Sequence, residues 1–246
     1  MDEKRITTDQ TTIRINKYLS AAGVCSRREA DQLTDAGRVT VAGKEIGTGE
    51  RIPADAEVFL DGRPVKAETR QVLLLFYKPR GIVCSTKKQR QETTVTEFLD
   101  YPVRVYPVGR LDRNTTGVLL LTNDGDLASK LTHPKFLKKK IYHVYCDKNV
   151  TKADLDQIVQ GITLDDGEIH ADAISYASDT DKSQVGIEIH SGKNRIVRRI
   201  FESLGYRVIK LDRVYFAGLT KKGLRRGDWR YLTEQEVAML RMGSFE

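Results

Sequence analysis

Two apolar runs separated by a polar loop place the strongest constraint on how this chain can fold. Residues 103–108 contain three valines, and the second run, 118–121, is Val-Leu-Leu-Leu. Short apolar runs bounded by glycine are typical of buried β-strands. The loop at 109–117 begins and ends with glycine and contains one acid, Asp112. A carboxylate on a loop between two buried strands is held rigidly near solvent, where reactive side chains are commonly placed.

The residues of this region alone leave open which carboxylate is reactive. An aspartate in a turn often bonds its own backbone, and this interpretation also fits Asp112. Asp124, followed by Gly125, has the pattern of such a turn. We expect Asp126 to be the N-cap of a helix that continues to Leu131. Asp112 is therefore one candidate among several acids.

Composition predicts a soluble, cytoplasmic protein with one large domain or a large and a small one. Among 246 residues, 30% are charged and 39% hydrophobic. No apolar run approaches the roughly 20 residues of a membrane span. Residues 1–12 are polar, which argues against a signal peptide and favours a short flexible lead-in. The three cysteines are far apart, and the four histidines lack metal-ligand spacing, so we expect reduced thiols and no metal.

The net charge of +7 attracts polyanions, but its distribution matters more than its size. The sharpest cluster of cations lies at the start of a helix expected over 195–204. Cations in this position suit phosphate or carboxylate binding. The alternative is an ordinary solvated face with Glu202 as an internal partner. The cluster consists of Lys193, Arg195, Arg198 and Arg199.

Residues 13–65 are predicted to form a small module of two helices followed by short strands. The second helix is expected to begin with a capping box formed by Ser26 and Glu29. Arg27 and Arg28 then lie in its first turn, where cations oppose the helix macrodipole. Phosphate contacts would explain these arginines, and toleration at the surface explains them equally well. The polar segment that follows, residues 66–71, is interpreted as a linker.

Residues 72–242 alternate many strands with a few helices, which predicts an α+β domain with a mixed or largely antiparallel sheet. A lysine run, 138–140, precedes a strand that carries Tyr142. The run suits a solvated sheet edge, with Tyr142 in the core; a tyrosine beside cations can also stack on a base. The glycines of 218–230 indicate a basic loop, for which RNA contact and simple solvation are equally plausible.

Several motifs occur in a fixed order along this larger unit. The most specific are Gly109-Arg110-Leu111-Asp112 and the segment 192–199, Gly-Lys-Asn-Arg-Ile-Val-Arg-Arg. Segments 77–81, Tyr-Lys-Pro-Arg-Gly, and 140–142, Lys-Ile-Tyr, agree with them. Together they resemble the RsuA/RluB/RluE/RluF family of pseudouridine synthases. Residues 13–65 resemble the alpha-L RNA-binding domain, also found in ribosomal protein S4, so the resemblance covers nearly the whole chain.

The resemblance implies conversion of uridine to pseudouridine in structured RNA, without a metal or cofactor. It also implies a catalytic domain built on a mixed, mostly antiparallel sheet with flanking helices. The family's reactive aspartate corresponds to Asp112, its partner arginine to Arg198 and its base-stacking tyrosine to Tyr142. The uridine must leave its stack to react, and Arg110 would fill the vacated space. The remaining cations expected to bind RNA are Arg27, Arg28, Lys193, Arg195 and Arg199.

The segment His133-Pro134-Lys135-Phe136, followed by lysines, looks closest to the RluB branch, which acts on large-subunit ribosomal RNA. A small-subunit target, or a dual ribosomal and transfer RNA target, remains open. We expect a monomer whose partner is ribosomal RNA or a ribosomal precursor particle. Two rivals are a non-catalytic RNA-binding assembly factor and a glycosidase-like hydrolase. The latter would need a second carboxylate beside Asp112.

Overall fold

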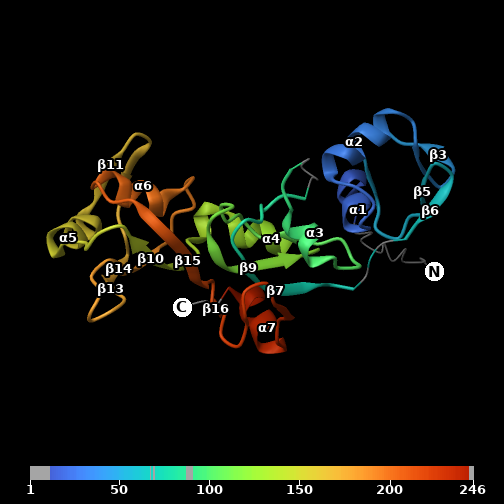
Figure 1. Cartoon of the computed structure of the whole chain (residues 1–246). Helices are drawn as coiled ribbons and strands as arrows, with labels where there is room; N and C mark the ends of the chain where they lie inside the picture. The colour runs from blue at the N-terminus through green and yellow to red at the C-terminus, as the bar shows by residue number, and fades with distance from the viewer. Residues whose placement is uncertain (1–11, 67, 69, 87–90, 244–246) are drawn as a thin grey trace, which may run out of the picture. The chain divides into compact units, whose positions relative to one another are not determined.

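The computed structural model describes residues 12–66, 68, 70–86 and 91–243. The chain divides into two compact units, Met1–Gln71 and Val72–Glu246, which we describe separately (Figure 1). The flexible lead-in expected over 1–12 lies outside the described residues, except for Thr12, which begins a strand.

In the N-terminal unit, two helices pack against short strands through a core that includes Ile15, Leu19 and Ala30. The Ser26 hydroxyl accepts from the Glu29 N–H, and the Glu29 carboxylate accepts from the Ser26 N–H, so the predicted capping box is confirmed. Strands β3-β2-β5-β6 form one sheet, and β1 pairs with β4. The elements are β1 (Thr12–Arg14), α1 (Ile15–Ala21), α2 (Arg27–Asp35), β2 (Val39–Val41), β3 (Lys44–Glu45), β4 (Arg51–Pro53), β5 (Val58–Leu60) and β6 (Arg63–Val65).

A nine-stranded sheet is the framework of the C-terminal unit. Its main path is β13-β14-β10-β15-β9-β7-β17, with β16 paired to β15 and β8 to β9. Strands β15 and β9 pair in parallel, and its other described pairs are antiparallel, so the predicted mixed sheet is confirmed. The strands are β7 (Leu73–Lys78), β8 (Tyr106–Pro107), β9 (Thr116–Thr122), β10 (Lys140–Cys146), β13 (Ala173–Tyr176), β14 (Gln184–Ile189), β15 (Val208–Phe216), β16 (Leu219–Thr220) and β17 (Trp229–Tyr231).

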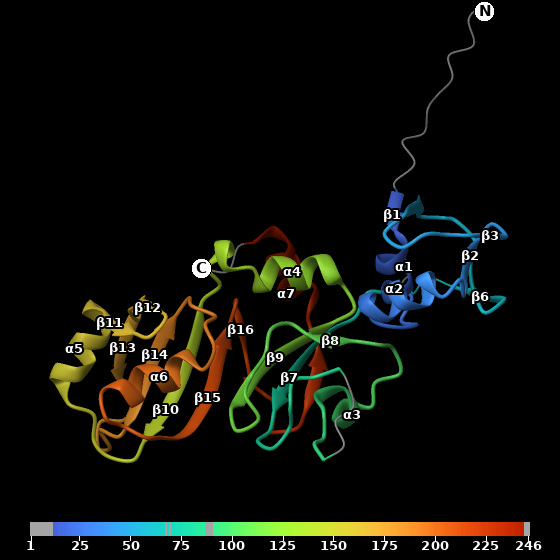
Figure 2. The same ribbon diagram turned by 90° about the horizontal axis from the view of Figure 1, so that it is seen from above.

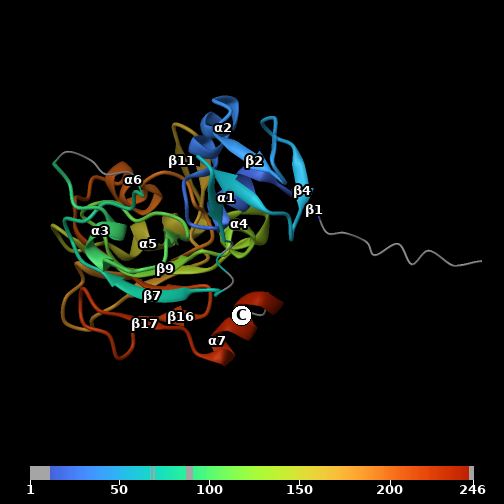
Figure 3. The ribbon, with the colours of Figure 1, turned by 90° about the vertical axis from the view of Figure 1, so that its right-hand side faces the viewer.

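Helices flank this sheet on both sides. Helices α3 and α6 lie on one face and α7 lies on the opposite face (Figures 1 and 3), while Figure 2 shows α5 beside the separate β11–β12 hairpin. The helices and this hairpin are α3 (Val95–Leu99), α4 (Gly125–Thr132), the short 3₁₀ helix η1 (Pro134–Phe136), α5 (Lys152–Gln160), β11 (Ile162–Leu164), β12 (Gly167–Ile169), α6 (Ile196–Ser203) and α7 (Glu234–Met242).

Strand β9 is buried on both faces, which explains its unbroken apolar sequence. Val118 and Leu120 pack into the cluster that includes α4 and α7, whereas Leu119 and Leu121 pack into the cluster beneath α3. All four side chains are completely buried. The loop that precedes β9 therefore emerges from the centre of the domain.

Two expectations about local structure are wrong. The N-cap of α4 is Asp124, whose carboxylate accepts from the N–H groups of Asp126 and Leu127. Asp126 lies in the first helical turn, where an acid is equally favourable, so the sequence pattern could not separate the two. The basic loop expected over 218–230 contains β17, which pairs with β7 at the sheet edge. Aromatic residues favour strands, and here this preference outweighs the glycines nearby.

Candidate active site

The loop that carries Asp112 is anchored by a buried lysine at the end of β7. Burial lowers the pKa of Lys78 from its ordinary value of 10.5 to about 8. The Asp112 and Arg113 carbonyl oxygens also accept from the N–H groups of Thr115 and Gly81, whereas Lys78 supplies the donor for those of Pro79 and Thr115. Sequence reasoning assigned Lys78 no role. The pattern that could have identified it is a lysine at the end of an apolar strand. The Lys78 ammonium donates to the carbonyl oxygens of Pro79 (3.0 Å), Asp112 (3.2 Å), Arg113 (3.3 Å) and Thr115 (2.9 Å).

Replacing Lys78 with methionine is expected to lower the free energy of unfolding by about 3 kcal/mol, because buried carbonyls lose their donor. The difference from wild type should grow between pH 8 and 10.5. Across that window the folded wild-type chain has released the Lys78 proton and the unfolded chain has not, so its stability rises with pH. Urea denaturation at about pH 7 and about pH 10 measures this; a difference independent of pH contradicts the shift.

Arg198, in the first turn of α6, faces Asp112. Its Nε lies 3.9 Å from Asp112 Oδ2, and its Nη1 donates to the Val208 carbonyl oxygen at 2.9 Å. The Arg198 side chain is 11% exposed and that of Asp112 is 38% exposed. Burial lowers the pKa of Arg198, while the Asp112 carboxylate opposes this shift. The guanidinium is thus fixed in place, and the carboxylate beside it stays accessible.

Asp112 and Tyr142 line the same cavity, of about 190 Å³, which we call the Asp112 cavity. Tyr142 lies on β10, opposite Arg213 of β15 and Ile187 of β14. Its ring packs against two apolar clusters while remaining partly exposed, so core packing and access to the cavity are both satisfied. Among the described residues, no second carboxylate lines the cavity, so the paired acids of a glycosidase are missing.

Arg110 and Arg195 also line the Asp112 cavity. The Arg110 side chain is exposed and, within the described part of the chain, makes no hydrogen bond or ion pair. Arg195 is the N-cap residue of α6, in the left-handed region with φ 48°, and its Nη2 lies 3.8 Å from Glu202. Arg195 therefore has the internal partner that the solvated-face alternative requires, whereas Arg110 is available for a ligand.

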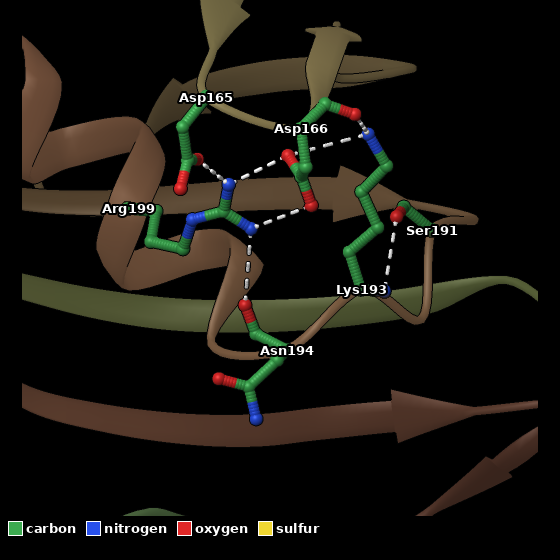
Figure 4. A network of polar contacts seen from close by, with 6 residues as sticks. All are labelled: Asp165, Asp166, Ser191, Lys193, Asn194 and Arg199. Carbon is green, nitrogen blue, oxygen red and sulfur yellow. Dashed lines mark hydrogen bonds and ion pairs between the residues drawn. The ribbon is translucent and has the colours of Figure 1, made fainter.

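Lys193 and Arg199 are held by the turn of the β11–β12 hairpin (Figure 4). Arg199 donates to both carboxylate oxygens of Asp166, at 2.6 and 3.0 Å, and also bonds Asp165. Lys193 Nζ donates to the Asp166 carbonyl oxygen at 2.9 Å. The hydrogen bonds from Arg199 lower the pKa of Asp166 to about 2. Sequence reasoning missed these acids because they are more than 25 residues away, and RNA binding by Lys193 and Arg199 stays a prediction.

Arg27 and Arg28 are exposed in the first turn of α2, in the N-terminal unit. Their role in RNA binding also stays a prediction. In the ranges that the structure describes, no helix has both the length and the apolar character needed to cross a membrane.

Two family models match this chain. One, described as RNA pseudouridylate synthase, matches residues 72–203, and the other, described as the S4 domain, matches residues 13–58. The first match contains Asp112, Tyr142 and Arg198, and the second contains α1 and α2 of the N-terminal unit.

Individual proteins agree with these matches over most of the chain. The chain is 40% identical to "Ribosomal large subunit pseudouridine synthase B" of Bacillus subtilis, across 93% of this chain and 95% of the relative. It is 32% identical to "Dual-specificity RNA pseudouridine synthase RluF" of Escherichia coli K12, across 92% and 78%. A crystal structure of a pseudouridylate synthase superposes with a TM-score of 0.66 and 26% identity, across 93% and 99%.

Proposed function

Because this chain belongs to the RNA pseudouridylate synthase family, we propose that it isomerises a uridine of large-subunit ribosomal RNA, with Asp112 as the reactive carboxylate. The reaction breaks the C1′–N1 bond of uridine and forms a C1′–C5 bond, and the proposed route uses no cofactor. The observation that carries the proposal is the accessible Asp112 carboxylate, 3.9 Å from the buried Arg198 guanidinium, in a cavity also lined by Tyr142. A carboxylate so placed can act as a nucleophile or accept a proton.

The large-subunit target rests on the name of the Bacillus subtilis relative, which is 40% identical over nearly the whole chain. The name of the Escherichia coli relative, at 32% identity, describes a dual-specificity enzyme, which keeps a second RNA substrate as an alternative. Mapping pseudouridines in ribosomal and transfer RNA from a strain lacking this protein separates these cases. One missing position in large-subunit RNA is expected. A missing position elsewhere overturns the target, and an unchanged map overturns the proposed substrate.

Replacing Arg27 and Arg28 together with glutamine is expected to flatten the dependence of RNA affinity on salt. Each phosphate contact contributes about one unit to the slope of log affinity against log salt, so the slope should fall by about two. Titrations of a ribosomal RNA fragment at several salt concentrations measure it. Arg63→Gln, an exposed arginine of the same unit, is the matched control. If the double variant keeps the wild-type slope, these arginines do not contact phosphate.

A further inference from the structure

Arg213, on β15, is a buried cation whose hydrogen bonds are incomplete. Its side chain is only 2% exposed, and its Nε donates to the Val118 carbonyl oxygen at 2.9 Å. Its guanidinium carbon lies 4.7 Å from the centre of the Phe216 ring. Its Nη2 is buried without a hydrogen-bond partner among the described residues. A buried charged group that lacks partners is unfavourable, so this arrangement calls for an explanation in terms of a ligand.

A second cation, Lys140, lies near Arg213 and adds to the positive charge that a ligand would neutralise. Both residues line the Asp112 cavity. Burial lowers the pKa of Lys140 to about 8, and the positive charge of Arg213 adds to that shift. The nearby Asp172 opposes it, but this carboxylate bonds His190 at 2.6 Å. The Lys140 ammonium donates to the carbonyl oxygens of Lys138 and His190, both at 2.9 Å. Within the described ranges, no carboxylate forms an ion pair with Arg213 or Lys140, so this end of the cavity carries positive charge without a negative partner.

The hydroxyl of Thr115 provides an independent sign of an absent partner at the same cavity. Thr115 is 2% exposed, and its Oγ1 is buried without a hydrogen bond in the described structure. A hydroxyl can donate or accept a hydrogen bond. Arg213 lies on β15, Thr115 immediately precedes the neighbouring strand β9, and both line the Asp112 cavity. Two incomplete polar groups on one cavity wall point to a common ligand.

The position of Arg213 relative to Tyr142 indicates which part of a uridine it would meet. The two residues are directly opposite each other where β10 pairs with β15. Side chains at such paired positions project from the same face and lie close together. A base stacked on Tyr142 therefore has its polar edge within reach of Arg213. With C1′ toward Asp112, the carbonyl groups of uracil are the acceptors available to the guanidinium.

We propose that Arg213, assisted by Lys140, stabilises the negative charge that uracil acquires when its glycosidic bond breaks. When C1′–N1 breaks, the electron pair stays on uracil and spreads over N1 and the two carbonyl oxygens, while C1′ becomes electron-deficient beside Asp112. Uracil C5 then supplies the electron pair of the new C1′–C5 bond. The C5 proton departs to solvent, and N1 gains a proton. Preorganised donors in a site shielded from water are effective at stabilising such developing charge.

The symmetry of uracil lets one arginine serve both halves of this reaction. Turning the base by half a rotation about its N3–C6 axis exchanges N1 with C5 and O2 with O4. The edge that faces Arg213 therefore presents a carbonyl oxygen before and after the turn, while N3–H keeps its place. Thr115 lines the same cavity, and its unpartnered Oγ1 would accept from N3–H. Charge stabilisation thus persists until the carbon–carbon bond has formed.

This inference rests on the proposed function, and its test compares uridine with 5-fluorouridine in a large-subunit ribosomal RNA fragment that the wild-type chain converts. Fluorine at C5 stabilises the uracil anion, so 5-fluorouridine depends less on Arg213. Because its C5 has no proton to lose once the C1′–C5 bond has formed, its product instead adds water across N1=C6, and this hydrated C-glycoside is the species measured. In Arg213→Met, conversion of uridine at saturating enzyme should slow by about 10²- to 10³-fold, as for loss of one oxyanion-hole donor. Conversion of 5-fluorouridine should slow much less. Rates come from chromatography of nuclease digests after single turnovers.

The ratio of the two rates in one preparation does not depend on how much of the variant folds. A higher ratio of the 5-fluorouridine rate to the uridine rate in Arg213→Met than in wild type, with a smaller increase in Lys140→Met, supports the inference. Equal slowing of both substrates, or weaker RNA binding with unchanged conversion at saturation, overturns it in favour of a structural or phosphate-binding role. Lys210→Met, an exposed cation on the same strand, is the control and should leave both rates unchanged. If the wild-type chain converts neither RNA, the proposed function itself fails.

Discussion

Asp112→Asn is expected to lower the rate of pseudouridine formation by about 10⁴-fold or more, the scale seen when a central catalytic side chain is removed. The amide has nearly the same shape as the carboxylate, but it can neither attack C1′ nor take up a proton. Because the Asp112 side chain is 38% exposed, folding and RNA affinity should change little. Release of tritium from RNA labelled at uridine C5 measures the rate, and filter binding measures the affinity.

Asp126→Asn is the matched control for this variant. It makes the same chemical change in the first turn of α4, where Asp126 is exposed and does not line the Asp112 cavity. The control should keep the wild-type rate. If Asp112→Asn retains more than about 1% of that rate, Asp112 is not the reactive group.

Gly117→Ala is expected to destabilise the protein by about 4 kcal/mol, which is large for a single methyl group. Gly117 pairs with Arg213 where β9 meets β15, and a Cβ here would lie 2.3 Å from the Arg213 carbonyl oxygen and 2.4 Å from its nitrogen. Its φ of 123° is also unfavourable for alanine. The two central strands must move apart to accommodate the methyl group. Urea denaturation measures the loss.

Gly223→Ala separates strain in the backbone from close approach of the two strands. Gly223 has φ 80°, but a Cβ there would meet nothing within 4 Å. Gly223→Ala should therefore lower the free energy of unfolding by only about 1 kcal/mol, the cost of the left-handed conformation for alanine. Equal losses in the two variants would mean that the contact between β9 and β15 is not the cause.

Much of the local structure could be predicted because it depends on neighbours in sequence. The capping box formed by Ser26 and Glu29 follows from residues three positions apart. The N-cap of α4 was misassigned because Asp124 and Asp126 both suit a helix start. The order of strands in the sheet depends on contacts between distant segments, which spacing alone does not encode.

The candidate site also contains residues that the sequence could indicate and residues that it could not. The family resemblance implied roles for Asp112, Arg198 and Tyr142; in the structure Asp112 and Tyr142 line one cavity, and Arg198 lies 3.9 Å from Asp112. Sequence reasoning missed Lys78 and Arg213, because their partners are backbone carbonyls, of the loop before β9 for Lys78 and of Val118 on β9 for Arg213. Side-chain spacing does not identify such partners, although a lysine that ends an apolar strand does mark Lys78 as unusual. The non-catalytic assembly factor considered from the sequence finds no support among the relatives, whose names describe synthases.

The attachment of the Asp112 loop to β7 and β9 has a consequence for how activity is lost. Lys78 extends from β7, a fully buried strand between β9 and β17, so we expect the loop to open only when that part of the sheet opens. Amide hydrogens of β9 should then exchange with solvent only through global unfolding. Denaturant should abolish turnover and tertiary structure in a single transition, without an inactive native form. In this catalytic domain, we therefore expect Asp112 to lose its position only when the domain unfolds.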